Sequence, residues 1–110
     1  MPQLTFRGFS DSTVQRASET LTPILAEILE CPEDYFTFDN LIVTSFFRGQ
    51  RVLTYPFIEI LWFDRGKEAR DSVALAVTKT VFEMGIPEVE ISFTASEKDN
   101  YYSNGKSFAD

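Results

Sequence analysis

The residues best suited to acid-base chemistry stand at the beginning of the chain. Met1 and Pro2 precede a short alternating segment, Gln3 to Phe9. A methionine followed by proline is usually removed during biosynthesis, which would leave Pro2 as a free secondary amine at the end of a strand. A neutral amine in that position can take a proton from carbon, so Pro2 is the candidate general base. The chain has no histidine, the side chain that usually does this work near neutral pH.

The content of histidine and cysteine excludes several kinds of site. Ser-His-Asp and Cys-His nucleophiles need an imidazole base, and zinc sites draw on cysteine and histidine ligands. Cys31 has no second cysteine for an internal disulfide, which fits a reducing compartment. The phosphate-binding motifs GxGxxG and GxxxxGK[ST] are absent. We therefore expect carboxylate, amine, arginine or tyrosine chemistry, with no metal and no cofactor.

Length and charge limit the partners of the chain. Its 110 residues predict a single domain over positions 1–110, and 44% hydrophobic residues can fill a core. Seventeen acidic and ten basic residues give a net charge of −7, which repels nucleic acid and anionic membranes. No apolar run approaches the ~20 residues of a membrane span, and no signal pattern is present. We expect a cytoplasmic protein that binds neither nucleic acid nor membrane.

The first half of the chain has the pattern of a strand, a helix and a strand. Alternation in Gln3 to Phe9 predicts a strand with Pro2 and Leu4 on one face. Ser10 or Asp11 can cap the following helix. Its apolar stripe consists of Val14, Ala17, Leu21, Ile24, Leu25, Ile28 and Leu29.

Proline and glycine set the expected breaks in this half. Pro23 removes a backbone donor inside the helical pattern and predicts a kink or break near Leu21. The segment from Tyr35 to Phe47 is predicted to be one long strand, and Arg48 to Gln50 the turn after it.

The second half repeats this order. Phe57 to Phe63 predicts an apolar strand, Asp64 to Gly66 a junction, and Val89 to Thr94 a last strand, with Gly85 as the helix stop before it. The apolar face of the intervening helix consists of Ala69, Val73, Ala76, Val77, Thr80 and Met84.

The repeated order indicates a duplicated βαβ unit. Pro32 lies 55 positions before Pro87, at the same junction of the two halves. Right-handed crossovers would place both helices on one face of a four-stranded sheet. The other face, with Phe57, Leu61 and Phe63, would need a cover, and association around a symmetry axis would supply it.

Several segments resemble the tautomerase superfamily, the relatives of macrophage migration inhibitory factor and the muconate isomerases. They are Met1-Pro2, residues 32–35 (PEDY), residues 46–49 (FFRG), residues 89–93 (VEISF) and residues 104–109 (NGKSFA). Residues 55–66 and 100–105 are most similar to an uncharacterised bacterial branch of that fold. The resemblance implies an α+β fold, with two pseudo-repeated βαβ units in a four-stranded mixed sheet and two helices on one face. It also implies a homotrimer with sites between subunits.

The resemblance implies a pocket around Pro2. Tyr101 and Phe108 match tail positions that line the pocket in the cytokine, and Trp62 matches a pocket wall at the end of the third strand. A cation must hold the oxygen of an enolate, and the cations near strand or turn ends are Arg7, Arg48 and Arg65. The predicted substrate-binding residues are Arg7, Arg48, Trp62, Tyr101 and Phe108. Arg7 alternates onto the face opposite Pro2, so it would serve only across a subunit boundary.

The chain departs from the family at other site positions. Cys31 stands where the cytokine carries a lysine, and Glu90 and Ser92 replace its tyrosine and asparagine. The muconate isomerases carry an arginine in the second strand, where this chain has Phe38 and Asp39. These differences keep the proline in place but argue against carrying over the substrates known for the family.

Three hypotheses for function follow. The first is a tautomerase-like isomerase that uses Pro2 on a small keto or enol acid, which requires removal of Met1. The second is a non-catalytic oligomeric module of the same fold that binds a ligand or a protein. The third, a structural assembly protein, rests on the apolar sheet face.

Overall fold

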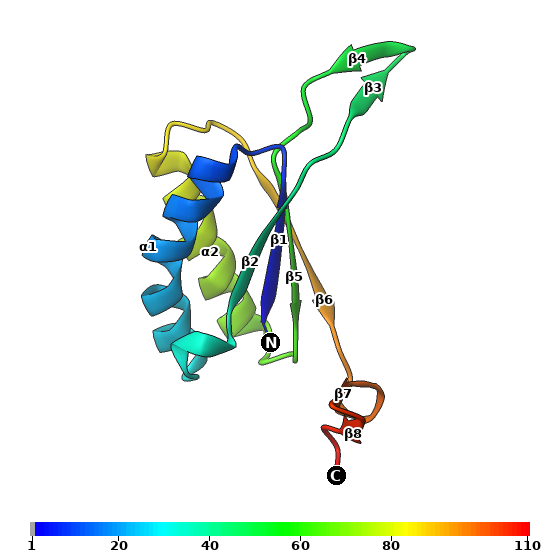
Figure 1. Ribbon diagram of the computed structural model, residues 1–110. Helices are drawn as coiled ribbons and strands as arrows, with labels where there is room; N and C mark the ends of the chain where they lie inside the picture. The colour runs from blue at the N-terminus through cyan, green and yellow to red at the C-terminus, as the bar shows by residue number, and fades with distance from the viewer. Residues whose placement is uncertain (1) are drawn as a thin grey trace.

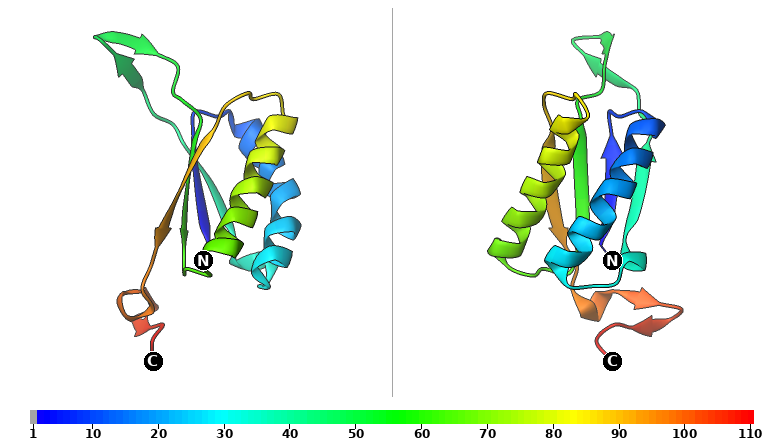
Figure 2. Two further views of the ribbon diagram at one scale, coloured as in Figure 1. Left: turned by 180° about the vertical axis from the view of Figure 1, so that it is seen from behind. Right: turned by 90° about the vertical axis from the view of Figure 1, so that its left-hand side faces the viewer.

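The computed structural model describes residues 2–110, which form two βαβ units. The first contains β1 (Gln3–Arg7), α1 (Asp11–Leu29) and β2 (Thr37–Leu41), and the second contains β5 (Phe57–Trp62), α2 (Lys67–Glu83) and β6 (Glu90–Ala95). The strands are parallel within each unit, and β1 and β5 are antiparallel. The sheet order is β2-β1-β5-β6, and both helices cover one face (Figures 1 and 2). The expected mixed sheet and α+β fold are confirmed.

Helix α1 begins where its sequence provides a cap. The Ser10 side chain accepts a hydrogen bond of 3.2 Å from the backbone nitrogen of Thr13, which satisfies a free donor of the first turn. At the other end, Glu30 takes a left-handed conformation with φ of 52°. This conformation is common where a helix stops.

The helix does not break near Leu21, one of the two outcomes expected from Pro23, because α1 continues through Pro23 to Leu29. Pro23 lies on the exposed side, while Leu21 and Leu25 on either side are buried in the core. Burial of these neighbours holds the helix in place despite the missing donor. Ile24 was expected in the buried stripe but is 39% exposed, because one residue of helix turns it away from Leu25.

The single long strand expected from Tyr35 to Phe47 is also wrong. Tyr35 ends the short helix η1 (Glu33–Tyr35), and β2 stops at Leu41, where its partner β1 ends at Arg7. The chain then leaves the sheet to form a hairpin of β3 (Ser45–Phe47) and β4 (Gln50–Val52), which projects from one end of the molecule (Figure 1).

The expected turn connects β3 and β4. Arg48 and Gly49 both have positive φ, 51° and 78°, as a tight two-residue hairpin turn requires.

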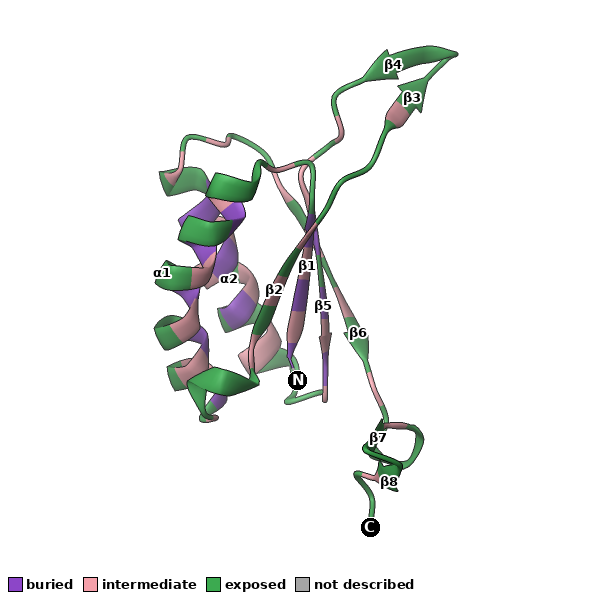
Figure 3. Cartoon of the chain, viewed as in Figure 1, coloured by how far each residue is buried: buried purple, intermediate pink, exposed green. Residues whose placement is uncertain are grey.

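The core lies between the sheet and the helices (Figure 3). Its strand residues are Leu4, Phe6, Ile58, Ile60 and Trp62, and its helix residues include Ala17, Leu21, Leu25, Val73, Val77 and Val81.

The uncovered sheet face is more polar than expected. Exposed Glu59 separates half-buried Phe57 and Leu61, because Glu59 also alternates onto this face. Thr5 and Ser92 lie opposite Glu59 on the neighbouring strands.

The C-terminal tail folds against the opposite end of the sheet from the β3-β4 hairpin (Figure 1). It contains the short helix η2 (Lys98–Asn100) and the strands β7 (Tyr102–Ser103) and β8 (Lys106–Ser107). The tail therefore shares its end of the molecule with the beginning of β1 and the end of β5.

A candidate site at the Pro2 end of the sheet

Pro2 is buried at the start of β1, beside the end of β5. The antiparallel register pairs Gln3 with Leu61, so Pro2 lies level with Trp62, and Pro2 accepts a hydrogen bond of 3.3 Å from the Thr37 nitrogen of β2. A cavity of about 20 Å³ adjoins it, room for about one water molecule. The lining residues are Pro2, Leu29, Cys31, Trp62, Phe63 and Arg65.

Trp62 is both a wall of this cavity and a core residue. Its side chain is 2% exposed, and its ring lies 5.0 Å from that of Phe93 on β6. Alternation along β5 turns Trp62 toward the helices, as it does Ile60. Trp62 therefore supplies a rigid apolar wall near Pro2.

Arg65 is the cation that lines the Pro2 cavity. Its Nη1 donates a hydrogen bond of 2.7 Å to the backbone oxygen of Leu29, in the last turn of α1. The carbonyl end of a helix is partly negative, so this bond holds the guanidinium in place. Arg65 reaches this position because it follows β5 directly, in the junction before α2.

Cys31 lines the same cavity as an uncharged group. Burial raises the pKa of its thiol, and the positive charge of Arg65 opposes that rise. The raised pKa keeps Cys31 in the thiol form at neutral pH. The position at which the cytokine carries a lysine thus contributes no charge here.

A second cavity of about 510 Å³ adjoins the first and shares Phe63 and Arg65 with it. Its lining residues are Tyr35, Phe63, Arg65, Lys98 and Phe108. Two of these are cations and none is acidic, in a chain whose net charge is −7. The volume falls in the usual range of small-molecule sites. This arrangement suits an anion with a flat apolar body.

Three aromatic rings pack together beside this cavity: Phe63, which follows β5, and Tyr101 and Phe108 of the tail. Phe63 and Phe108 line the cavity. The ring centroids of Phe63 and Tyr101 are 5.3 Å apart, those of Phe63 and Phe108 are 5.6 Å apart, and those of Tyr101 and Phe108 are 4.8 Å apart. The Tyr101 hydroxyl also accepts a hydrogen bond of 3.4 Å from Gln3 Nε2. These contacts attach the tail to the end of the sheet that carries Pro2.

Within one chain, the two arginines predicted to bind substrate, Arg7 and Arg48, do not line the cavities near Pro2. Arg7 ends β1 at the far end of the sheet, where its guanidinium lies 4.9 Å from the centre of the Phe57 ring. Arg48 occupies the turn of the β3-β4 hairpin. Trp62, Tyr101 and Phe108, in contrast, all lie at the Pro2 end.

Sequence reasoning missed Lys98, Tyr35 and Phe63 as lining residues. The polar tail did carry a signal, because Lys98 precedes a cluster of aromatic residues that ends at Phe108. Removal of Met1, on which a free Pro2 amine depends, concerns a residue outside the described part of the chain.

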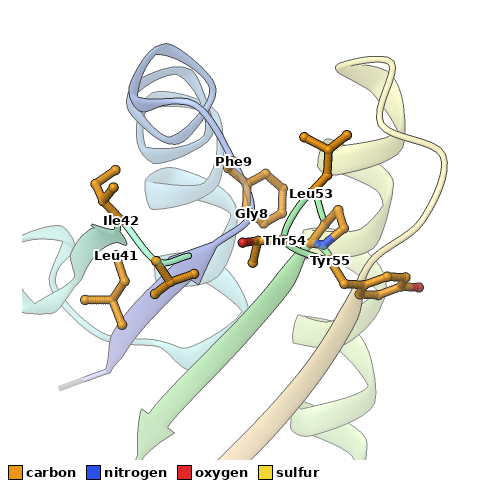
Figure 4. A pocket seen from close by; sticks show the side chains of 9 residues that line it. Gly8, Phe9, Leu41, Ile42, Leu53, Thr54 and Tyr55 are labelled. Carbon is orange, nitrogen blue, oxygen red and sulfur yellow. The ribbon is translucent and has the colours of Figure 1, made fainter. Parts of the chain in front are cut away.

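A third cavity lies at the opposite end of the sheet, at the base of the β3-β4 hairpin (Figure 4). Its volume is about 520 Å³. The lining residues are Gly8, Phe9, Leu41, Ile42, Val43, Leu53, Thr54, Tyr55 and Pro56. No charged side chain lines it among residues 2–110, so this cavity lacks the acid-base groups that the Pro2 end has.

Comparison with known proteins identifies the family. The family model "Domain of unknown function (DUF1904)" matches residues 1–107. The chain belongs to this family. A crystal structure of a DUF1904 domain from Sebaldella termitidis is 36% identical, with a TM-score of 0.91, over 97% of this chain and 99% of that one. No curated protein matches the chain.

The DUF1904 chain also has the fold of the tautomerase superfamily. A macrophage migration inhibitory factor-like protein from Entamoeba histolytica is 17% identical, with a TM-score of 0.73, over 96% of this chain and 97% of that one. A fused 4-OT, described as an asymmetric trimer, is 12% identical, with a TM-score of 0.81, over 98% and 97%. Pt0534 inactivated by 2-oxo-3-pentynoate is 20% identical, with a TM-score of 0.74, over 98% of each chain. The predicted tautomerase-like fold is confirmed.

Two further findings concern the described part of this DUF1904 chain. Neither helix has the length and apolar character needed to cross a membrane. Within residues 2–110, no three or more acidic or cysteine side chains are grouped so as to hold a metal ion.

Proposed function

We propose that this protein is a tautomerase-like isomerase in which Pro2 is the general base for a small keto or enol acid. The observation that carries the proposal is the position of Pro2. It lines a buried cavity that shares Phe63 and Arg65 with a larger cavity containing two cations and no acid. Pro2, the proposed proton acceptor, thus lies beside a cavity whose cations can bind an anion.

The proposed reaction moves one proton. Burial among apolar side chains disfavours a protonated amine, so a free Pro2 nitrogen would be neutral and able to accept a proton. The C–H bond beside the substrate carbonyl breaks, the proton goes to Pro2, and the electron pair forms an enolate. Pro2 then returns the proton to another atom of the substrate, which completes the tautomerisation without a co-reactant.

The cations have separate roles in this proposal. Arg65 is next to Pro2 and is fixed by Leu29, so it faces the developing enolate oxygen. Lys98 lies on the tail side, 6.0 Å from the centre of the Phe63 ring, and would bind the carboxylate. Tyr101 and Phe108 would hold the apolar body of the substrate. The 2-oxo acid-type inactivator of Pt0534 supports the choice of a keto acid.

The protein is further proposed to act as a homotrimer. The fused 4-OT of the same fold is described as a trimer, and this chain exposes large apolar side chains on its β3-β4 hairpin. Arg7 or Arg48 would then reach a site only from a neighbouring subunit.

A non-catalytic binding module is the second candidate. Cys31 favours this candidate, because its uncharged thiol stands beside Pro2 at the position where the cytokine carries a lysine. In this alternative, the larger cavity binds an anion that is not converted.

The deciding experiment begins with the mass of the chain purified from its native cell. Loss of Met1 is expected, since the base must be a free amine. Ketonisation of enol-phenylpyruvate is then measured for the processed protein, for Pro2→Ala and for the control Pro87→Ala at the other end of the molecule. Pro2→Ala is expected to lower the rate by about 10²-fold or more, and Pro87→Ala to leave it unchanged.

Two outcomes would reject the isomerase. One is a mature chain that retains Met1, and the other is an equal rate for wild type and Pro2→Ala across a panel of enols and keto acids. Saturable binding of phenylpyruvate without turnover would instead support the binding module.

A further inference from the structure

The outer face of α2 exposes two large apolar side chains. Leu75 is 72% exposed and Phe82 is 51% exposed. They are seven positions apart, which is about two helical turns, so both project from the same side of the helix. The other side carries Val73, Val77 and Val81 into the core. The core thus covers one apolar side of α2, and the side with Leu75 and Phe82 is free to bind a partner.

This outer face is hollowed along the second half of the helix. A cavity of about 380 Å³ is lined by Leu75, Thr78, Lys79, Phe82 and Glu83. All five residues belong to α2, so the hollow is open and suits the side chains of another helix better than an enclosed small molecule. It shares no residue with the cavities near Pro2.

The charges on this face are arranged symmetrically about Leu75, the middle residue of α2. Lys79 follows Leu75 by four positions, and Asp71 precedes it by four. Glu83 follows it by eight positions, and Lys67 precedes it by eight. Each of these charges has an opposite charge at the same distance on the other side of Leu75. A twofold axis at Leu75 would therefore bring opposite charges level with each other in two copies of the helix.

Asp71 and Lys79 are both available for such a contact. Asp71 Oδ2 accepts a hydrogen bond of 2.6 Å from Lys67 Nζ, yet the Asp71 side chain remains 57% exposed. A carboxylate can accept further hydrogen bonds. Lys79 is exposed and forms no ion pair within residues 2–110. A second copy of α2 would give each of them a partner of opposite charge.

We propose that α2 pairs with α2 of a second copy, antiparallel and centred on Leu75. The two Leu75 side chains meet at the twofold axis, and Lys79 of each chain contacts Asp71 of the partner subunit. Phe82 rests on the carbon stem of the partner subunit's Glu68. The first half of each helix thus fills the hollow on the second half of the other.

The pairing depends neither on the proposed isomerase nor on the proposed homotrimer. Helix α2 lies on the outside of the molecule, next to α1 (Figure 2), so the pairing leaves the other face of the sheet free. A helix of 17 residues is about 25 Å long. One such pair buries less surface than a standard stable interface, so the association is expected to be weak and is measured at high protein concentration.

Charge reversal tests the pairing by sedimentation velocity. Lys79→Glu would place like charges against each other and is expected to weaken the association by about tenfold or more. Arg16→Glu, at an exposed position of α1, changes the net charge equally and is expected to associate as wild type does. Adding Asp71→Lys to Lys79→Glu restores both the opposite charges and the wild-type net charge, so this double variant is expected to regain the association.

Disulfide cross-linking tests the register in a Cys31→Ala background. Leu75→Cys would bring two thiols together at the twofold axis, and mild oxidation is expected to give a covalent dimer. Phe82→Cys is the matched control on the same face. In the antiparallel pair its two thiols would lie about 21 Å apart along the helices, which is beyond the reach of a disulfide.

The outcomes separate the pairing from other association. Association that Lys79→Glu leaves unchanged would overturn the pairing, because another surface would then cause it. Equal cross-linking of Leu75→Cys and Phe82→Cys would overturn the antiparallel register. Far-UV circular dichroism of the charge variants should match wild type, since the substituted side chains are exposed.

The same variants separate the pairing from the proposed function. Ketonisation of enol-phenylpyruvate should be unchanged in Lys79→Glu, because the outer face of α2 shares no residue with the cavities near Pro2. Failure of the pairing would leave the isomerase intact. An inactive protein that still associates through α2 would reject the isomerase and support the pairing.

Discussion

Arg65 Nη1 lies 2.7 Å from the backbone oxygen of Leu29, and this hydrogen bond connects the two βαβ units beside Pro2. Leu29 ends α1 in the first unit, and Arg65 follows β5 in the second. The bond satisfies a carbonyl that the helix leaves free and places a positive charge at its negative end. Arg65 thus serves the stability of the fold and the candidate site together.

Arg65→Gln is expected to lower the free energy of unfolding by about 1 to 3 kcal/mol, because a hydrogen bond from a charged group is lost at a helix end. Urea unfolding measures this. Phenylpyruvate binding should weaken in the same variant.

Arg70→Gln is the control for this prediction. Arg70 approaches Asp64 at only 3.9 Å, with a side chain that is 39% exposed. Such a surface pair contributes little, so its loss should change stability by less than about 1 kcal/mol. Equal effects of the two substitutions would contradict the role given to Arg65.

Gly8→Ala is expected to lower the free energy of unfolding by about 2 to 5 kcal/mol, because it adds both backbone strain and a steric overlap. Gly8 has a φ of +86°, and a Cβ there would lie 2.7 Å from the Tyr55 backbone oxygen. Gly49→Ala is the matched control, because Gly49 has a φ of +78° but no atom within 4 Å of its Cβ. It should cost only about 1 to 2 kcal/mol. Chemical denaturation measures the free energy of unfolding of both variants. Equal losses would contradict the close approach of Gly8 to the Tyr55 backbone.

Pro23→Ala is expected to stabilise the protein by about 1 to 2 kcal/mol. Alanine restores a helical N–H and a better helix propensity, and it loses a smaller advantage that proline holds in the unfolded chain. Pro23 is exposed, so no core contact is removed. Pro23→Gly should gain about 1 kcal/mol less than Pro23→Ala. Thermal unfolding of the three proteins gives the order, and a less stable alanine variant would contradict it.

The alkylation rate of Cys31 should rise at higher pH than that of a free thiol, because burial raises its pKa above the ordinary value of 9.0. Arg65→Gln should move the pH profile further upward, since the positive charge of Arg65 opposes the rise. The midpoint of the iodoacetamide rate against pH is the measurement. A midpoint below that of a peptide thiol would disprove the prediction.

The same shift has a consequence for stability. Above pH 9.0 the unfolded chain loses the Cys31 proton before the folded chain does, so stability should fall as pH rises through this window. Cys31→Ala should remove that part of the slope. An unchanged slope would show that other groups cause it.

Local sequence patterns were sufficient to predict a segment whose apolar side chains all lie on one face. Leu4 and Phe6 alternate with polar residues, and Ser10 precedes a clear helical stripe, so the first strand and helix follow from side-chain geometry. The β3-β4 hairpin could not be predicted in this way. The residues after Leu41 have the composition of a strand, but β1 ends at Arg7 and offers no further partner.

The candidate site was predictable only in part, because it also depends on contacts between segments that are distant in the sequence. Pro2 was predicted from its residue type and position, and Tyr101 and Phe108 were predicted from a resemblance. Arg65 was named only as an available cation, while Arg7 and Arg48 were predicted to bind the substrate, and Lys98 was missed. Which cation lies beside Pro2 depends on the register of β1 with β5 and on the bond to Leu29.

The amino-acid sequence by itself determined the order of the elements, the two βαβ units and the exclusion of imidazole chemistry, because periodicity and composition are local properties of the chain. The tertiary structure decided that Arg65 and Lys98 share a cavity near Pro2 while Arg7 lies at the far end of its strand. It also decided that the chain leaves the sheet after Leu41 and forms the β3-β4 hairpin. Both outcomes depend on strand pairing between distant segments, which no local pattern encodes.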